Sequence, residues 1–368
     1  MTFVPLRIAM IGTPFYDIPP KGYGGIELIC AALTDALVER GHSVTLFGAG
    51  LRGGTRGTFL STNPRLQPER LGQVMPDLLH AARVNRLLRM GCGRFDIVHD
   101  HSAAGPLMAG VRSAPTVVTV HGGADSEMGD LYADLGDSVG LIAISVLQRR
   151  HRHDLNWVGT VSNAVDPTRF AAEHRPDGPV LWLARFSPDK GPDLAIQACR
   201  SAGLPLVLAG KCNEPEEQRY LDEVIRPMIG PDVRLVLNAD RCATQQLLTA
   251  ARCLIMPIRW NEPFGMVMVE AMASGTPVVA LRRGSVPEIV RHGVTGWICD
   301  DPEELPQWLH RSGGLDSAAC VAHVRKHFSA GAMAQAYENV YRKTIFRHRR
   351  GRDVGRRIMA HQPANRPG

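Results

Sequence analysis

Two glutamates separated by seven residues carry the clearest sign of chemistry in this 368-residue chain. Glu262 precedes a Pro-Phe-Gly turn, and Glu270 lies in the apolar segment that follows it. Pro263 suits a helix start, where its missing N–H would be unpaired anyway, and Gly265 lets the backbone approach a ligand. We expect a short helix that ends at Gly275-Thr276-Pro277. This arrangement predicts two carboxylates and a helix N-terminus at one cleft.

The helix start itself predicts an anion site. The free amides of Gly265, Met266 and Val267 would face a bound anion, with the helix dipole behind them. The two carboxylates could accept hydrogen bonds from hydroxyls on either side of a bound phosphate. Taken alone, such a pair is more often a surface Glu262 and a Glu270 neutralised by an arginine. The flanking residues therefore decide between the two interpretations.

The flanking residues resemble a known family. Phe264-Gly265, Glu270-Ala271-Met272-Ala273 and Gly275-Thr276-Pro277-Val278 are similar to the C-terminal signature of retaining glycosyltransferases of family 4, which have the GT-B fold. Similar segments cover almost the whole chain, at residues 6–48, 119–122, 161–170, 180–191 and 328–341. The resemblance implies transfer of a hexosyl unit from a nucleotide diphosphate sugar to an acceptor hydroxyl, with retention of anomeric configuration.

Length and composition suit such an enzyme. The chain can form two domains that each bury a core, and 44% hydrophobic with 21% charged residues is typical of a globular protein. No apolar run reaches the roughly 18 residues of a membrane span, and the N-terminus lacks signal-peptide features, so we expect a cytoplasmic protein. The eight cysteines form no Cys-x-x-Cys pair, which favours reduced thiols over a metal or disulfide framework.

Short apolar runs alternate with helical stretches, which predicts an α/β fold with parallel sheets. A helix is expected at 26–40. The expected strands are 7–11, 44–47, 97–99, 116–120, 140–144 and 160–161 in the first half, and 180–183, 206–208, 233–236, 254–256, 278–280 and 296–298 in the second. We therefore predict two doubly wound, Rossmann-like domains that face a central cleft, where ligands bind beyond the strand C-termini.

The domain boundaries follow from the same pattern. We predict an acceptor-side N-terminal domain (1–170), a nucleotide-sugar donor domain (171–329) and a helix (330–346), which in the resembled family crosses back to the N-terminal domain. The basic tail at 347–368 contributes much of the net charge of +6 and is expected to be disordered. It lacks interleaved aromatic residues, so no nucleic-acid partner is expected, and membrane contact would be peripheral at most.

Two loops are candidates for the donor diphosphate. Gly24-Gly25 precedes a helix and, by the resemblance, faces the diphosphate from the N-terminal domain with Glu27 in support. Arg185 and Lys190 follow a strand of the second domain; surface solvation is the ordinary state of such cations, but the resemblance assigns them to the leaving diphosphate. The chain contains no Asp-x-Asp triplet, and cations in place of a metal fit that absence, so no cofactor is expected.

Further roles come from the resemblance alone. His121, in a Thr-x-His-Gly context, corresponds to a histidine that contacts the donor sugar, while Asp100 and His101 lie on the acceptor side. Glu262 would hold hydroxyls of the transferred sugar and Glu270 those of the ribose. Phe264, Gly265, Met266 and Val267 complete the donor-binding set. Asn163 corresponds to a hinge turn, although Ala164 stands where the family usually has glycine.

Base and acceptor identity are the open points. Residues 237–240 and 210–212 depart from the family pattern at loops near the base, and UDP is favoured over GDP or ADP from similarity in 260–287. The acceptor could be a small molecule, a glycan or a lipid-linked compound. A nucleotide-sugar epimerase and a non-catalytic nucleotide-sugar binder remain alternatives, whereas a nicotinamide dehydrogenase lacks its glycine fingerprint.

Overall fold

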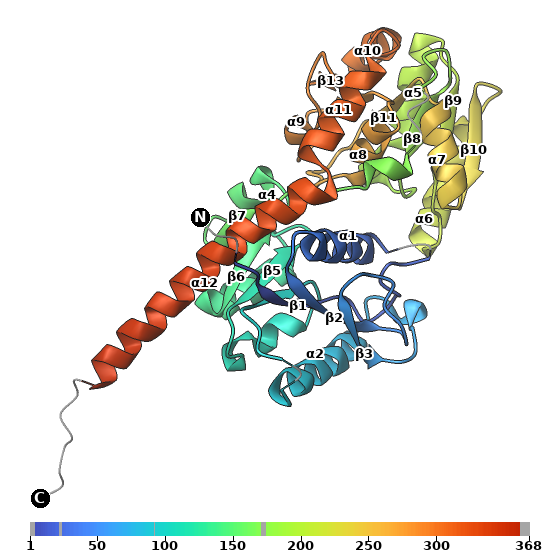
Figure 1. Cartoon of the computed structure of the whole chain (residues 1–368). Helices are drawn as coiled ribbons and strands as arrows, with labels where there is room; N and C mark the ends of the chain where they lie inside the picture. The colour runs from blue at the N-terminus through green and yellow to red at the C-terminus, as the bar shows by residue number, and fades with distance from the viewer. Residues whose placement is uncertain (1–3, 22–23, 92, 171–173, 361–368) are drawn as a thin grey trace, which may run out of the picture.

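The computed structural model describes residues 4–21, 24–91, 93–170 and 174–360. It contains two parallel sheets, each in its own domain, with helices on both faces (Figure 1). The strand order is β3-β2-β1-β4-β5-β6-β7 in the first sheet and β10-β9-β8-β11-β12-β13 in the second. In both, the order reverses direction at the first strand, as in doubly wound folds. The predicted α/β architecture with two Rossmann-like domains is confirmed.

The N-terminal domain extends to the end of β7. Its strands are β1 Arg7–Ile11, β2 Ser43–Ala49, β3 Thr58–Asn63, β4 Ile97–Asp100, β5 Thr116–Val120, β6 Val139–Ala143 and β7 Trp157–Thr160. Its α-helices are α1 Gly25–Glu39, α2 Val74–Arg89, α3 Glu127–Leu135 and α4 Val146–Arg150. Strand β3 was not predicted. It lies at the sheet edge and is largely exposed or half-buried, so its sequence lacks the apolar run that identifies central strands.

The C-terminal domain has the six strands expected from the sequence. They are β8 Val180–Leu183, β9 Leu206–Gly210, β10 Val233–Leu237, β11 Cys253–Met256, β12 Val278–Leu281 and β13 Gly296–Cys299. The helices are α5 Pro192–Ala202, α6 Pro215–Tyr220, α7 Arg241–Ala250, α8 Met266–Ala273, α9 Val286–Ile289, α10 Leu305–Ser312 and α11 Ser317–His327. The predicted boundary at 170/171 adjoins residues 171–173, which lie outside the described residues, and stays a prediction.

Helix α12 (Ala330–Ala360) crosses back along the N-terminal domain, as expected (Figure 1). Tyr337 and Tyr341 are fully buried in the same core cluster as Leu33 and Leu37 of α1. The predicted end at 346 is wrong, because residues 347–360 continue the helix. Arginine is a good helix former, and a helix already nucleated by docking propagates easily through polar residues. Residues 361–368 of the predicted tail lie outside the described residues.

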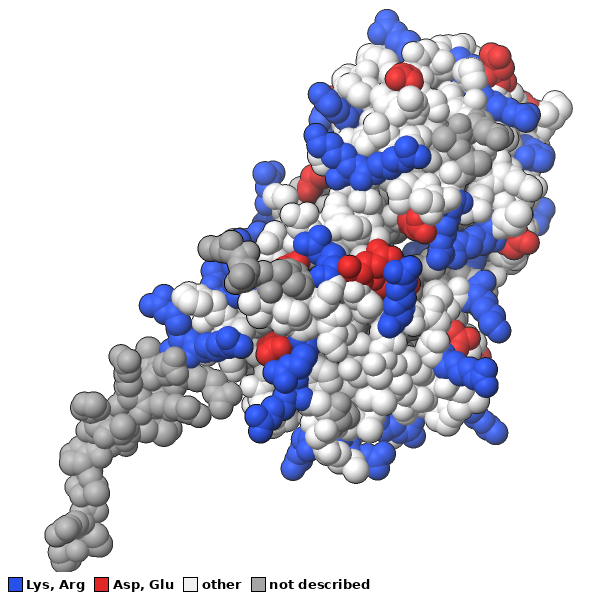
Figure 2. Space-filling view, in the orientation of Figure 1, with Lys and Arg blue, Asp and Glu red and all other residues white. Residues whose placement is uncertain are grey.

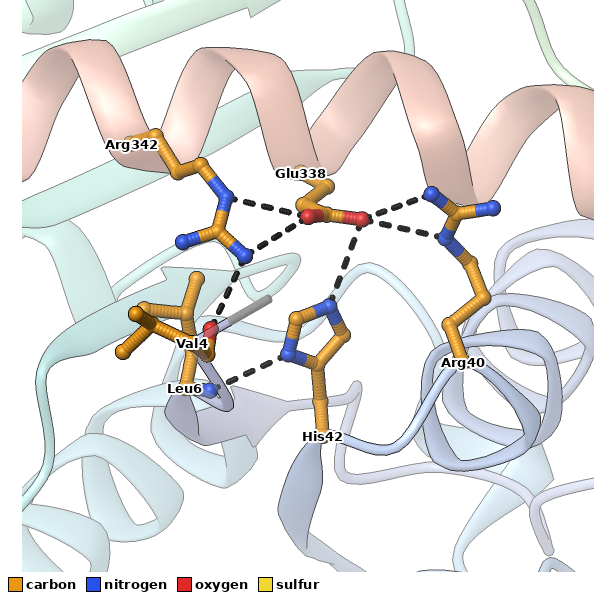
Figure 3. Close-up of polar contacts among 6 residues, drawn as sticks. All are labelled: Val4, Leu6, Arg40, His42, Glu338 and Arg342. Carbon is orange, nitrogen blue, oxygen red and sulfur yellow. Dashed lines mark hydrogen bonds and ion pairs between the residues drawn. The ribbon is translucent and has the colours of Figure 1, made fainter. Parts of the chain in front are cut away.

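A carboxylate on α12 fixes the helix to the N-terminal domain (Figure 3). Glu338 accepts hydrogen bonds at 2.7 Å from both Arg40 and Arg342 and lies 3.4 Å from His42. Burial raises the pKa of Glu338, but the hydrogen bonds from Arg40, Arg342 and His42 outweigh burial and lower the pKa to about 2.

Among the described residues, no helix is both long and apolar enough to span a membrane.

We expect Glu338→Gln to lower the free energy of unfolding by about 2–4 kcal/mol at pH 7, because two arginines lose a largely buried carboxylate. The matched control is Glu39→Gln, whose ion pair with Arg56 is more than half exposed on both sides and is expected to be worth less than about 1 kcal/mol. Urea unfolding measures both. The Glu338 contribution should be present above pH 4.5 and disappear towards pH 2. Equal losses in the two variants would contradict this account of α12 docking.

Candidate active site

Glu262 lies in the turn between β11 and α8, and its position depends on two glycines, Gly265 in that turn and Gly284 in the loop between β12 and α9. Gly265 precedes α8 with φ 76°, and a Cβ there would lie 2.7 Å from Met268 Cε and 3.2 Å from Glu262 Cγ. Gly284 has φ 55°, and its Cβ would lie 2.3 Å from the Glu262 backbone N and O. Only glycine fits these positions. The predicted short helix after Gly265 is confirmed, and it ends at Ala273, just before Gly275.

The turn that begins at Gly284 supports the segment around Glu262 through hydrogen bonds. Ser285 donates its backbone N–H to the Glu262 carbonyl at 2.9 Å and its hydroxyl to the Phe264 carbonyl at 2.7 Å. Gly284 N donates to Asn261 Oδ1 at 3.2 Å. The residues Gly284-Ser285-Val286-Pro287-Glu288 are typical of a turn, but the local sequence does not show that this turn supports the Glu262 segment. A glycine-serine pair between a strand and a helix was the available signal.

Lys190 and Glu262 form an ion pair. Lys190 Nζ lies 2.6 Å from Glu262 Oε2, and the two side chains are 12% and 15% exposed. The ammonium also lies 4.4 Å from the centroid of the Trp260 ring, a cation–π contact. The sequence assigned Lys190 to the diphosphate and Glu262 to the sugar, and the structure brings these two predicted residues together.

Arg185 has a different partner. Its Nη1 donates to Glu217 Oε1 at 3.1 Å, and the Arg185 side chain is 56% exposed whereas that of Glu217 is 6% exposed. Glu217 also accepts the backbone N–H of Asn213 at 3.0 Å and belongs to the capping box of α6. Glu217 was not predicted from the sequence as a site residue. The pattern Glu214-Pro215-Glu216-Glu217 was its signal, since an N-cap followed three residues later by Glu forms such a box.

Glu270 borders the space between the domains. It is half-buried in α8, and its carboxylate makes no hydrogen bond to the part of the chain that the structure describes. Burial raises the pKa of Glu270, while Arg241 acts in the opposite direction. Glu270, Met266 and Arg241 line a cavity of about 500 Å³ whose other wall includes Leu28 and Asp35 of α1. Glu270 thus lines a cavity whose walls come from both domains, and its contact with a nucleotide ribose stays a prediction.

Gly24 and Gly25 lie at the start of α1. Gly24 has φ 143°, and a Cβ there would lie 2.8 Å from the Glu27 carboxylate, whereas the position of a Gly25 Cβ is open space. Glu27 is buried and accepts a hydrogen bond from the Thr13 hydroxyl. Burial raises the pKa of Glu27, and the Thr13 hydrogen bond partly offsets this. Glu27 therefore contacts the Gly24 loop, Gly25 is exposed, and the role of these residues at a diphosphate stays a prediction.

His121 belongs to a row of three histidines at the tips of β4 and β5. His101 Nδ1 lies 2.9 Å from His121 Nε2, and the rings of His99 and His101 are 4.0 Å apart. His99 also pairs with Tyr341 of α12 and with Thr119, at 2.7 Å each. Burial lowers the pKa of His121 to about 4 and those of His99 and His101 well below the ordinary value. All three imidazoles are neutral at pH 7.

Asp100 is fully buried, which bears on its predicted acceptor-side role. Arg112 donates to one carboxylate oxygen at 3.0 Å, and the other oxygen accepts from Ser102 N and Oγ at 3.0 and 2.7 Å. A Cβ on Gly105 would lie 2.3 Å from this carboxylate. The Asp100 carboxylate is therefore fully engaged in shaping this loop. His101 is buried too, and the acceptor-side roles of Asp100 and His101 stay predictions.

The hinge prediction at Asn163 stays untested, although its setting is informative. Asn163 is buried, and its Oδ1 has no hydrogen-bond partner among the described residues. Two residues later, Val165 N donates to the Phe328 carbonyl at 2.9 Å, which links the chain after β7 to the segment before α12. The two interdomain connections thus run side by side.

Comparisons with known proteins agree with this geometry. The model of "Glycosyltransferase Family 4" matches residues 23–171, and that of "Glycosyl transferases group 1" matches residues 168–309. The phosphatidyl-myo-inositol mannosyltransferase of Mycobacterium tuberculosis is 25% identical over 327 residues, which cover 82% of this chain and 84% of the relative. The D-inositol 3-phosphate glycosyltransferase of Jonesia denitrificans is 28% identical over 296 residues, covering 67% and 68%.

A solved structure extends the similarity to three dimensions. That of AviGT4, a glycosyltransferase involved in avilamycin A biosynthesis, has a TM-score of 0.69 and 25% identity and covers 93% of this chain and 98% of that one. The two facing Rossmann-like domains and the returning helix define a GT-B glycosyltransferase. The chain belongs to glycosyltransferase family 4, and it is an enzyme of that class.

Proposed function

We propose that this enzyme transfers a hexosyl unit with retention from a nucleotide diphosphate sugar, UDP-sugar first, to an acceptor hydroxyl without a metal cofactor. The observation that carries the proposal is the half-buried Lys190–Glu262 pair beside the start of α8. A cation, a carboxylate and free helix amides occur together there. That combination can bind a diphosphate and a sugar hydroxyl at the same time.

Charge development explains what these groups would do. Cleavage of the bond between the anomeric carbon and the diphosphate leaves positive charge on the sugar and negative charge on the leaving oxygens. Lys190, Arg185 and the Met266 amide would stabilise the leaving oxygens, and fixed electrostatic groups of this kind often give the largest catalytic contribution. Glu262 already accepts a hydrogen bond from Lys190, so a sugar hydroxyl bound to Glu262 would extend an existing hydrogen-bond network.

The acceptor proton would pass to the departing phosphate oxygen during front-side attack, which accounts for retention. No side chain is assigned as a covalent nucleophile. His121, being neutral, would exchange a hydrogen bond with the transferred sugar instead of placing a cation beside the developing positive charge. Glu270, which is without a hydrogen bond in the described chain, would accept from the ribose hydroxyls in the interdomain cavity.

The direct test is a binding screen of UDP-, GDP- and ADP-sugars followed by mass analysis of products. The acceptor panel should start with inositol phosphates and phosphatidylinositol, because the two curated relatives are named for such acceptors, and should include a cell extract. We expect a product that is heavier than the acceptor by one hexosyl unit. Conversion of the donor into another nucleotide sugar would instead indicate an epimerase, and binding without turnover would indicate a binding protein.

We expect activity to survive chelation, because side-chain cations neutralise the leaving group in this proposal. The rate in excess EDTA should stay within about twofold of the untreated rate. A control with added magnesium or manganese should give no further increase. Loss of activity in EDTA that returns with either metal would contradict metal independence.

A further inference from the structure

Glu288 joins the two domains through hydrogen bonds to the backbone. Its two carboxylate oxygens accept from the amides of Val146 and Leu147 at 2.6 and 2.8 Å. These amides are in the first turn of α4, where backbone N–H groups have no partner within a helix. Glu288 lies on α9 of the donor domain, whereas α4 belongs to the N-terminal domain, and both lie on the side where the domains meet (Figure 1).

On the N-terminal side, Gln148 of α4 holds the loop that carries His121. Its side-chain amide donates to the carbonyls of Val120 and Gly122 at 2.8 and 2.6 Å, one on each side of His121. Its Oε1 accepts from Ile144 N at 2.8 Å, which fixes the amide orientation because reversal would set oxygen against two carbonyls. The side chain is buried. The position of α4 therefore sets the position of His121.

On the donor side, Glu288 belongs to the same turn that supports Glu262. Glu288 N donates to the Ser285 carbonyl at 2.9 Å, and Ser285 in turn holds the carbonyls of Glu262 and Phe264. Ile144, which precedes α4, is buried in the donor-domain core cluster that also contains Val286 and Ile289 of α9. Apolar packing thus accompanies the polar link between the two domains.

We infer that Glu288 and Gln148 are positioning residues that set His121 of the N-terminal domain relative to Glu262 of the donor domain. The inference rests on the proposed function, which assigns His121 and Glu262 to the transferred sugar. The Glu288 hydrogen bonds are solvent-exposed. Neither residue contacts the substrate in this assignment.

Figure 2 shows Lys and Arg side chains spread over the drawn face of both domains, with fewer acidic side chains scattered among them and one acidic group near the middle of the molecule. The Glu288 link does not depend on such a surface ion pair, because its partners are backbone amides. Its contribution should therefore change little with salt, since direct hydrogen bonds to neutral amides lack the long-range charge attraction that salt screens. This separates it from a general effect of removing one surface charge.

The test compares Glu288→Ala with Glu303→Ala, an exposed glutamate of the same domain. In hydrogen exchange, the segments 119–125 and 144–150 should exchange at least fivefold faster in Glu288→Ala only. With a nucleotide sugar that the wild-type enzyme uses as a substrate, kcat of Glu288→Ala should fall about tenfold, while its dissociation constant for UDP should change less than twofold. Glu288→Gln keeps one acceptor oxygen and should be intermediate. Gln148→Met combined with Glu288→Ala should be no worse than the stronger single variant, because both act through α4.

Two results would overturn the inference. One is wild-type exchange in both segments of Glu288→Ala. The other is a loss of UDP affinity as large as the loss of kcat, which would place the effect inside the donor domain. Because Glu288 is exposed, its variant should fold, and hydrogen exchange gives an answer even if the wild-type protein transfers no sugar. Absence of wild-type turnover with the exchange effect present would refute the proposed function alone.

Discussion

Replacement of Lys190 by alanine is expected to lower kcat/KM about 10²–10³-fold, on the order of 3–4 kcal/mol of transition-state stabilisation. The variant removes the cation assigned to the leaving diphosphate and leaves the Glu262 carboxylate, only 15% exposed, without its partner. Arg185→Ala should reduce turnover 10²-fold or more by removing the second cation. Steady-state kinetics with purified donor measures both.

The control for Lys190→Ala is Lys326→Ala, an exposed lysine at the end of α11. It removes the same charge from an exposed position to which no role in binding or catalysis is assigned, and it should keep full activity. Circular dichroism and thermal unfolding establish that the variants are folded. Near wild-type turnover in folded Lys190→Ala would remove Lys190 from the reacting centre, and with it the main argument for a diphosphate site beside α8.

The two glutamates of the motif are expected to fail in different ways. Glu270 lines the interdomain cavity and is assigned to the ribose, where binding is the same in the ground and transition states, so Glu270→Ala should raise the donor KM more than it lowers kcat. Glu262 forms an ion pair with Lys190 and is assigned to the transferred sugar, where its interaction would strengthen as charge develops. Glu262→Ala should therefore lower kcat itself, by about 10²-fold.

Glu262→Gln and Glu270→Gln separate charge from hydrogen bonding. The Glu262→Gln variant would keep one acceptor for a sugar hydroxyl but lose the ion pair with Lys190, so it should recover only part of kcat. The Glu270→Gln variant keeps an acceptor for the ribose and should recover most of the affinity. Equal increases in KM for the two alanine variants, with kcat unchanged, would restrict the whole motif to nucleotide binding.

Much of the fold could be predicted because the apolar patterns of its helices and strands lie within short segments of the sequence. Central strands such as β5 and β11 are continuous apolar runs, and helix α1 has an apolar face that ends near Gly41. The edge strand β3 was missed because a half-exposed strand needs no such run. The helical extent of α12 was underestimated because polarity was taken as a sign of disorder, although arginine and lysine favour helix formation.

For the candidate site, the sequence predicted individual residues but not the residues with which they pair. Glu262 and Lys190 are 72 positions apart, and nothing local indicates that they form an ion pair. Glu217 could have been noticed through its capping pattern, but its contact with Arg185 depends on how the loops after β8 and β9 approach each other. The burial of Asp100 could not be predicted either, because position at a strand tip says nothing about the contacts that Arg112 and the Ser102 turn make with its carboxylate.

The anomeric configuration of the product tests the central claim most directly. The enzyme would be incubated with an α-configured UDP-sugar and an acceptor identified in the screen, and the new linkage followed by proton NMR from its first appearance. The proposed front-side transfer, with Lys190 and Arg185 on the leaving diphosphate and no nucleophile on the opposite face, predicts an α-linked product. A β-linked product would contradict retention and the roles assigned to Glu262 and Lys190.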